Sequence, residues 1–282
     1  MDKPRYLEII TPKRRWFDTR LWELWHYRDL IVLFVKRDFV AQYKQTVLGP
    51  IWFVLQPLLT ALVFFIVFGK IAAIPTAGIH PFLFYFTGLT FWGYFSDVFL
   101  KCANTFSVNA SLFGKVYFPR LAVPLSILAS GLIKLLVQIM VLIGIIIGFN
   151  LAGMATTTLN WTLTLIPVYT LLLALLAMGL GLLFSSLTTK YRDFSFLLTF
   201  GVQLLMYATP IIYPLSFARG AMHEILKWNP LTSIVENLRY SVFSSGTFDG
   251  LGLVYTAVFA LFTLVLGVVF FNRVEQSFMD TV

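Results

Sequence analysis

Long apolar runs recur along the whole chain, and each is long enough to cross a lipid bilayer as a helix. A helix needs about 20 mainly apolar residues to span the hydrocarbon core. Backbone groups must pair internally there, which favours helices, and the alternating ten-residue segments of a barrel are not seen. The pattern predicts an all-α integral membrane protein with six transmembrane helices, at residues 51–73, 82–100, 121–149, 161–187, 194–214 and 251–271.

A basic segment with several tryptophans, residues 21–46, precedes the first run. At 100° per residue, one helical face carries Val32, Val35, Phe39 and Tyr43, and the opposite arc is polar. This predicts an N-terminal amphipathic helix lying in the membrane interface. Two interpretations stay open: the helix is only a membrane anchor, or its charged arc meets an anionic ligand or a partner protein.

Positive charge is distributed unevenly around the six runs. Most of the 21 Lys and Arg residues fall before the first run, in the 101–120 loop, between the fourth and fifth runs, or in the tail. This bias predicts a multi-pass protein with cytoplasmic N- and C-termini. The corresponding division is a cytoplasmic segment 1–50, a transmembrane domain 51–272 and a cytoplasmic tail 273–282. Because the basic residues flank membrane runs, the net charge of +8 does not indicate nucleic acid.

The composition argues against catalysis on this chain. Charged residues make up 12% of the sequence, and the single cysteine, Cys102, excludes an internal disulfide and a cysteine-based metal site. The P-loop, H-E-x-x-H and G-x-S-x-G patterns are missing, and the three histidines lie far apart. We therefore expect no metal or cofactor on the chain, and transport driven from outside it. A membrane-embedded glycosyl or acyl transferase is the competing hypothesis, which would need paired acids or histidines near one membrane face.

Aromatic residues are unusually dense in the second run. Packing between helices is one interpretation, and a ring-lined path on which sugars stack is the other. The conduit candidates are Trp52, Tyr85, Trp92 and Tyr207. Ionisable residues inside the runs are rare: Lys134 in the third is a functional candidate or reaches back to the headgroups. Asp97, near the inner end of the second, is weak support for a proton-coupled carrier.

Two connecting regions are unusual. The 101–120 loop predicts a short helix near residues 109–116, with Asn109 as a possible N-cap and with exposed Phe113 and Phe118 that a partner protein or the lipid interface would cover. The 215–246 region predicts a hairpin of two short helices, the second starting at Asn229-Pro230. Its apolar face carries Leu231, Ile234 and Leu238, which fits a surface loop or an outer gate.

Several short motifs occur in a recognisable order. They are W-H-Y-R-D-L (25–30), R-D (37–38), Y-K-Q-T-V-L-G-P-I-W (43–52), Q-P-L (56–58), F-P-R (118–120), Y-R-D (191–193), Y-A-T-P-I-I-Y-P (207–214) and W-N-P-L (228–231). Together they resemble the permease subunit of ABC-type polysaccharide exporters, which move lipid-linked O-antigen, capsule or teichoic acid chains out of the cytoplasm across the inner membrane. Which glycan and which lipid carrier are left open.

The resemblance implies a homodimer that works with two copies of a separate ATP-binding cassette ATPase, which would bind ATP and Mg. It also implies short outer gate helices before the last span. By position, the cargo's lipid-linked end would enter beside Leu48 and Gly49, and we assign its pyrophosphate to Arg37 and Lys44. The coupling helix that contacts the ATPase would lie in the 101–120 loop, with Asn109, Leu112, Phe113, Lys115 and Tyr117. An exporter of another amphipathic cargo, a lipid or a drug, is the alternative.

Overall fold

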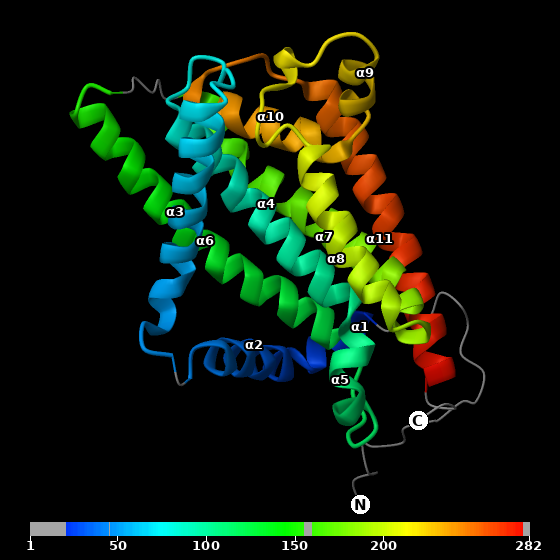
Figure 1. Cartoon of the computed structure of the whole chain (residues 1–282). Helices are drawn as coiled ribbons and strands as arrows, with labels where there is room; N and C mark the ends of the chain where they lie inside the picture. The colour runs from blue at the N-terminus through cyan, green and yellow to red at the C-terminus, as the bar shows by residue number, and fades with distance from the viewer. Residues whose placement is uncertain (1–20, 45, 155–159, 279–282) are drawn as a thin grey trace, which may run out of the picture.

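A computed structural model describes residues 21–44, 46–154 and 160–278, and within these residues all regular structure is helical (Figure 1). The helices are α1 (Leu21–His26), α2 (Arg28–Tyr43), η1 (Gly49–Ile51), α3 (Trp52–Phe64), η2 (Phe65–Ile71), α4 (Pro81–Ala103), α5 (Thr105–Phe113), α6 (Ala122–Leu151), η3 (Trp161–Leu165), α7 (Ile166–Lys190), α8 (Asp193–Tyr207), η4 (Leu215–Phe217), α9 (Ala221–Lys227), α10 (Pro230–Phe243) and α11 (Gly250–Phe278).

Four helical stretches are long and apolar enough to cross a membrane. They are Gly49–Ile71, Ala122–Leu151, Trp161–Lys190 and Gly250–Glu275, and they confirm four of the six predicted spans. The run predicted at 82–100 forms α4. Its 23 residues are enough to cross a bilayer, but α4 is not among these four apolar stretches. The prediction for 194–214 is too long. Helix α8 has 15 residues, about 22 Å, and the chain leaves the helix before Pro210, which has no N–H for helical pairing.

The connecting helices gather at two opposite ends of the molecule. Helices α2 and α5 lie at the end reached by the last turns of α11, whereas α9 and α10 lie at the other end (Figure 1). We refer to these as the α2 end and the α10 end. The 101–120 loop and the N-terminal amphipathic helix therefore share one side of the molecule, and the 215–246 hairpin lies on the other.

Helix α4 runs through the middle of the bundle, in contact with α3, α6 and α7. Its rings explain the aromatic density of the second run, because most of them are buried against one another and against neighbouring helices. The Tyr85 ring is fully buried and meets the Phe64 and Phe84 rings edge to face. For these residues, helix packing is the interpretation that holds.

Helix α2 lies across the α2 end and packs against α6 (Figure 1). Its buried face differs from the predicted one. Phe34 is buried and Phe39 half-buried, but Val32 is 51% exposed and Val40 is exposed as well. The helix is apolar on more than one side, so the contact with α6 selects a face that periodicity alone did not identify.

Candidate functional site

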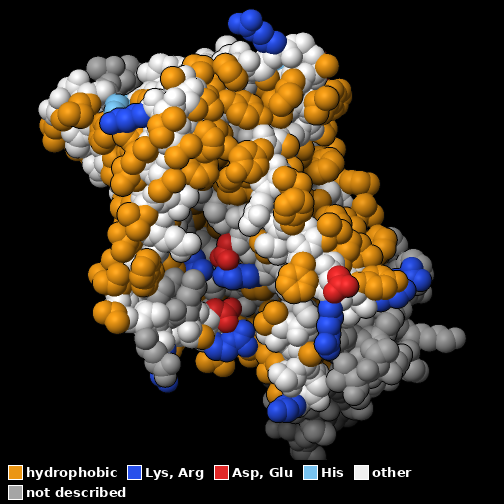
Figure 2. All heavy atoms as spheres, in the orientation of Figure 1, with side chains coloured by type: hydrophobic (Ala, Val, Ile, Leu, Met, Phe, Trp, Pro, Cys, Tyr) orange, Lys and Arg blue, Asp and Glu red, His pale blue; other side chains and the backbone are white. Residues whose placement is uncertain are grey.

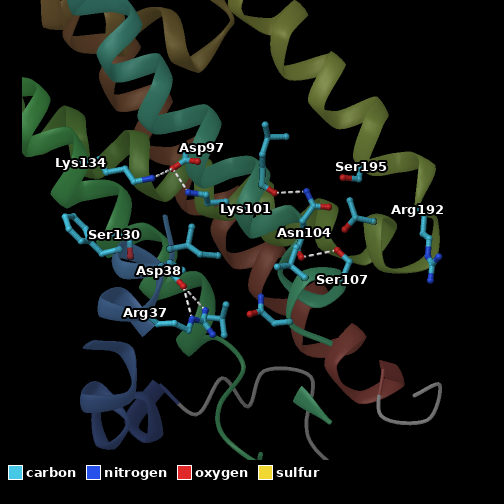
Figure 3. A pocket seen from close by; sticks show the side chains of 18 residues that line it. Arg37, Asp38, Asp97, Lys101, Asn104, Ser107, Ser130, Lys134, Arg192 and Ser195 are labelled. Carbon is cyan, nitrogen blue, oxygen red and sulfur yellow. Dashed lines mark hydrogen bonds and ion pairs between the residues drawn. The ribbon is translucent and has the colours of Figure 1, made fainter. Parts of the chain in front are cut away.

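A cavity of about 1030 Å³ with a charged lining lies at the α2 end. Its walls come from α2, α4, α5, α6 and the start of α8 (Figure 3). Four basic side chains line it together with two acidic ones: Arg37, Lys101, Lys134, Arg192, Asp38 and Asp97. Figure 2 shows acidic and basic side chains gathered in a recess below a broad apolar surface. The lining is therefore net positive and suits an anionic group.

Arg37 lines this cavity and is already paired within α2. Its Nη2 and Nε atoms lie 2.8 and 2.9 Å from Asp38 Oδ1, and its guanidinium lies 4.8 Å from the centre of the Phe34 ring. Asp38 offsets much of the charge, but the arginine side chain remains 43% exposed. Arg37 is thus positioned at the cavity with its unused N–H groups available to an anion.

The other residues predicted for substrate access lie apart from the cavity. Lys44 directly follows α2 and is exposed, and Leu48 is exposed in the turn that leads to α3. Gly49 adopts φ of +53°, a left-handed conformation that glycine accepts more easily than other residues. The structure brings only Arg37 of this predicted group to the cavity wall.

Asp97 on α4 connects two lysines that the sequence analysis did not pair. Asp97 Oδ2 lies 2.8 Å from Lys101 Nζ on the next turn of α4, and 3.4 Å from Lys134 Nζ on α6 (Figure 3). Lys134 also lies over the Phe53 ring, 5.5 Å from its centre. Its ammonium group therefore points into the protein, toward Asp97, rather than away to the headgroups.

A second cavity of about 670 Å³ adjoins the first and shares Asp97 and Lys134 with it. Among its lining residues are Trp52 and Trp92, two of the four predicted conduit aromatics, as well as the amide side chain of Gln56. Tyr85 lies outside both walls in the core, and Tyr207 is an exposed residue at the end of α8. The structure therefore brings together half of the predicted aromatic set.

The helix in the 101–120 loop differs from the prediction in two ways. Helix α5 begins at Thr105, and Asn109 lies within it at a kink, where its amide donates to the Thr105 carbonyl at 2.9 Å. Asn109 is therefore not the N-cap. Phe113 is only 2% exposed, since it packs on Phe106 and Phe118, so its predicted exposure is wrong.

Phe118 is buried too, and the Arg120 guanidinium lies 5.3 Å from the centre of the Phe113 ring. These rings hold the loop against the bundle. After α5 the accessible residues include Tyr117, at 56% exposure, with Lys115 and Val116 beside it, whereas Leu112 is half-buried.

The predicted start of α10 is confirmed. Asn229 Oδ1 accepts from the Leu231 N–H at 3.0 Å, and Pro230 occupies the first turn. Leu231, Ile234 and Leu238 are all buried. Helix α10 packs against α4, α7 and α11, so several helices hold the hairpin in place.

A buried arginine fixes α10 to the segment after α8. Arg239 Nη1 donates to the Pro210 carbonyl at 2.5 Å and Nη2 to the Ile211 carbonyl at 2.8 Å, and Glu236 Oε1 lies 3.3 Å from Nη1. Burial lowers the pKa of Arg239 to about 10, while the Glu236 carboxylate opposes the shift. The guanidinium therefore stays charged near neutral pH.

Sequence reasoning missed Lys101 and Arg192 as partners in one site. The available signals were the i,i+4 spacing of Asp97 and Lys101 and the Y-R-D motif that contains Arg192. Within the part of the chain that the structure describes, no three His, Cys, Asp or Glu side chains come close enough to hold a metal ion. The arrangement can bind an anion and accommodate rings or sugars beside it.

Comparison of the sequence with known proteins places the chain in a family. Residues 29–243 match the model of the ABC-2 type transporter family. The chain is 28% identical over 255 residues to the O-antigen export system permease protein RfbA of Klebsiella pneumoniae, covering 89% of this chain and 94% of that protein. RfbA of Myxococcus xanthus is 29% identical over 217 residues, covering 76% and 80%.

The polysialic acid transport protein KpsM of Escherichia coli is 26% identical over 245 residues, covering 87% of this chain and 93% of KpsM. Each of these matches covers at least three quarters of both proteins. With a family match over most of its length, the chain belongs to the ABC-2 type transporters, as a transmembrane permease subunit of a family that works with a separate ATPase rather than as a catalytic domain.

Proposed function

We propose that this chain is the permease of an ATP-driven exporter that moves a lipid-linked polysaccharide from the cytoplasmic side across the inner membrane. The observation that carries the proposal is the pair of adjoining cavities, one net positive and the other lined by tryptophans. Relatives named for export of O-antigen and transport of polysialic acid support a glycan as cargo.

The positive cavity would receive the anionic linkage of the cargo at the cytoplasmic face. Arg37 contributes a planar guanidinium that can bind phosphate through two parallel hydrogen bonds. Arg192 adds an exposed cation at the start of α8. Lys44, with Leu48 and Gly49, would attract and admit the headgroup from the membrane beside the cavity, because basic residues near the surface attract anionic lipid by about 1 kcal/mol each.

The second cavity would hold the first sugars. Sugar C–H faces stack on rings, and Trp52 and Trp92 provide two. The Tyr94 hydroxyl, on the same wall, is buried and lacks a hydrogen-bond partner among the described residues, so a sugar hydroxyl could satisfy it. Tyr207, exposed on α8, would extend the path, and Tyr85 would support the wall from within the core.

Coupling to the ATPase would occur on the outer surface of the 101–120 loop. Tyr117 and Lys115 are exposed there, and Leu112 is half-buried behind them. Phe113 would transmit movement inward, since it packs on Phe106, whose ring stacks on Phe271 of α11 at 4.5 Å. Two ATPase copies and a second permease copy would complete the transporter.

The α10 hairpin would close the outer side of the path. Leu231, Ile234 and Leu238 form its buried apolar face, and Asn229 and Pro230 start the helix beneath it. Since many contacts hold α10, opening would require the segment after α8 to move with it. In this arrangement the α2 end faces the cytoplasm.

The proposal is tested by surface glycan in cells. Deleting the gene that encodes this chain should abolish surface display of the host's exported glycan, and re-expression of the chain should restore it. The double variant Arg37→Ala, Arg192→Ala should restore about a tenth or less, because it removes two cavity cations that each contribute about 1 kcal/mol or more. Lys36→Ala, an exposed neighbour outside the cavity, is the matched control. Normal glycan display in the deletion strain would overturn the proposal.

A further inference from the structure

Three charged side chains form the boundary between the two cavities. Lys134 and Asp97 line both, and Lys101 lines the first. Both ammonium nitrogens contact the same oxygen, Asp97 Oδ2, at 2.8 and 3.4 Å. The two lysines therefore converge on one point from different helices, and the group as a whole keeps one positive charge (Figure 3).

Asp97 and Lys134 lie away from the ends of their helices, whereas Lys101 lies in the last turn of α4. Asp97 lies about 9 Å along α4 from its end at Ala103, and Lys134 about 18 Å along α6 from its start at Ala122. Charged residues within a membrane domain are costly and usually face a cavity or pathway. Among the described residues, the ion pairs of both lysines go to the one carboxylate of Asp97, which leaves one positive charge for an anion to meet.

We propose that Lys101 and Lys134 form a binding site for a phosphate group carried on a lipid, with Asp97 as an internal counter-ion that the phosphate displaces. The inference rests on the proposed function, since the lipid phosphate would belong to the cargo. It adds a second anion site, deeper than Arg37 and Arg192, where the cargo passes from the charged cavity to the tryptophan-lined one.

Whether a ligand displaces Asp97 from the two lysines depends on the charge of the ligand. An anion with one negative charge gains little over the resident Asp97 carboxylate. A pyrophosphate carries more charge and several oxygens, so it can reach both ammonium groups with bonds of about 2.8 Å. Asp97 can yield because its side chain is 38% exposed, whereas Lys134 is only 16% exposed and is held over the Phe53 ring.

The competing explanation is that the Asp97–Lys134 pair only joins α4 to α6. The two explanations predict different effects of an Asp97 substitution on phosphate affinity. If the pair is only structural, Asp97→Asn weakens the protein and adds nothing to ligand affinity. If Asp97 competes with the ligand, the same substitution leaves two unpaired lysines and strengthens phosphate binding.

The test measures binding of farnesyl pyrophosphate to the full chain in phosphatidylcholine nanodiscs, with thermal unfolding recorded for each variant. Affinity should fall about five- to tenfold in Lys134→Gln and rise about fivefold in Asp97→Asn. Lys134→Arg should keep most of the affinity, and Lys36→Gln should change it less than about twofold. Lys101→Gln gives a second measurement of lost affinity should Asp97→Asn not fold.

The phosphate source is distinguished in the same discs. Inorganic pyrophosphate in place of the farnesyl compound measures the anion alone, and phosphatidylglycerol as competitor measures bulk anionic lipid. If the site takes a phosphate carried on a lipid, the chain should bind farnesyl pyrophosphate more tightly than inorganic pyrophosphate or phosphatidylglycerol. Absence of binding by the parent chain, or equal affinity in the parent, Lys134→Gln and Lys101→Gln, would overturn the inference.

The experiments distinguish a failure of this inference from a failure of the proposed function. Normal glycan export together with unchanged farnesyl pyrophosphate affinity in the lysine variants removes this site and leaves the exporter. Lysine-dependent binding in a chain whose deletion does not affect surface glycan removes the glycan as cargo and leaves the phosphate site.

Discussion

At the residue scale, Arg239 joins three parts of the chain that are distant in sequence. From α10 it reaches the carbonyls of Pro210 and Ile211, and its guanidinium lies 3.5 Å from the centre of the Phe84 ring on α4. Glu236 Oε1 contacts Arg239 and also accepts from the Leu215 N–H at 3.3 Å. One side chain thus satisfies the carbonyls that are released where α8 ends.

Arg239→Met should destabilise the protein by about 3–5 kcal/mol, because it removes the ion pair of Glu236 and the donor to two buried carbonyls. Thermal unfolding of the purified protein in detergent measures the loss. Arg219→Met replaces an exposed arginine of the same outer region and should change stability by less than about 0.5 kcal/mol. Equal unfolding temperatures for Arg239→Met and the parent would show that the contacts of Arg239 contribute little to stability.

At the element scale, α7 owes its central position to small residues. A Cβ atom on Gly179 would lie 2.6 Å from the Leu264 backbone nitrogen of α11, and one on Gly181 would lie 2.5 Å from Cys102 Cβ of α4. Small residues let membrane helices approach closely, where packing rather than the hydrophobic effect holds them together. The sequence shows these glycines but not which helices they face.

Gly179→Ala should destabilise the bundle by about 1–3 kcal/mol, because the added methyl group meets backbone atoms of α11 that cannot move independently. Gly201→Ala on α8 is the matched control: nothing lies within 4 Å of its Cβ, and alanine should stabilise that helix by up to about 1 kcal/mol. The measurement is thermal unfolding of both variants beside the parent. A Gly179→Ala protein as stable as Gly201→Ala would exclude the close α7–α11 contact.

At the scale of the whole molecule, the arrangement has two chemically different ends. The α2 end holds the charged cavity and the 101–120 loop, and the α10 end is closed by α9 and α10 (Figure 1). Exposed apolar side chains cover the flanks between them (Figure 2). This division is expected for a membrane protein that admits cargo at one face and releases it at the other.

Cysteine labelling in intact cells tests the orientation. The only native cysteine, Cys102, is buried, so single new cysteines can be compared directly. Lys227→Cys, at the exposed end of α9, should react with a membrane-impermeant maleimide, and Lys115→Cys should react only after permeabilisation. Labelling of Lys115→Cys in intact cells, with Lys227→Cys protected, would reverse the proposed orientation.

Local features could be predicted because they depend on neighbours in sequence. The Asn229 cap is an example, since its carboxamide needs only the N–H of Leu231. The prediction of Asn109 as an N-cap was wrong, because α5 begins at Thr105, four residues earlier, and Asn109 lies at a kink within the helix. The predicted exposure of Phe113 and Phe118 was also wrong, because a position in a loop does not reveal which parts of the bundle pack against it.

Apolar run length, capping and ordered motifs are properties of short stretches, so they could be read without a structure. They predict the all-helical membrane character, four of the spans, the start of α10 and the resemblance to polysaccharide exporters. The packed helices were needed to show that Lys101 and Lys134 meet at Asp97, that Arg37 and Arg192 share one cavity, and that Arg239 holds the segment after α8. These pairings join helices far apart in sequence, and their register is set by how whole helices pack rather than by the residues that meet.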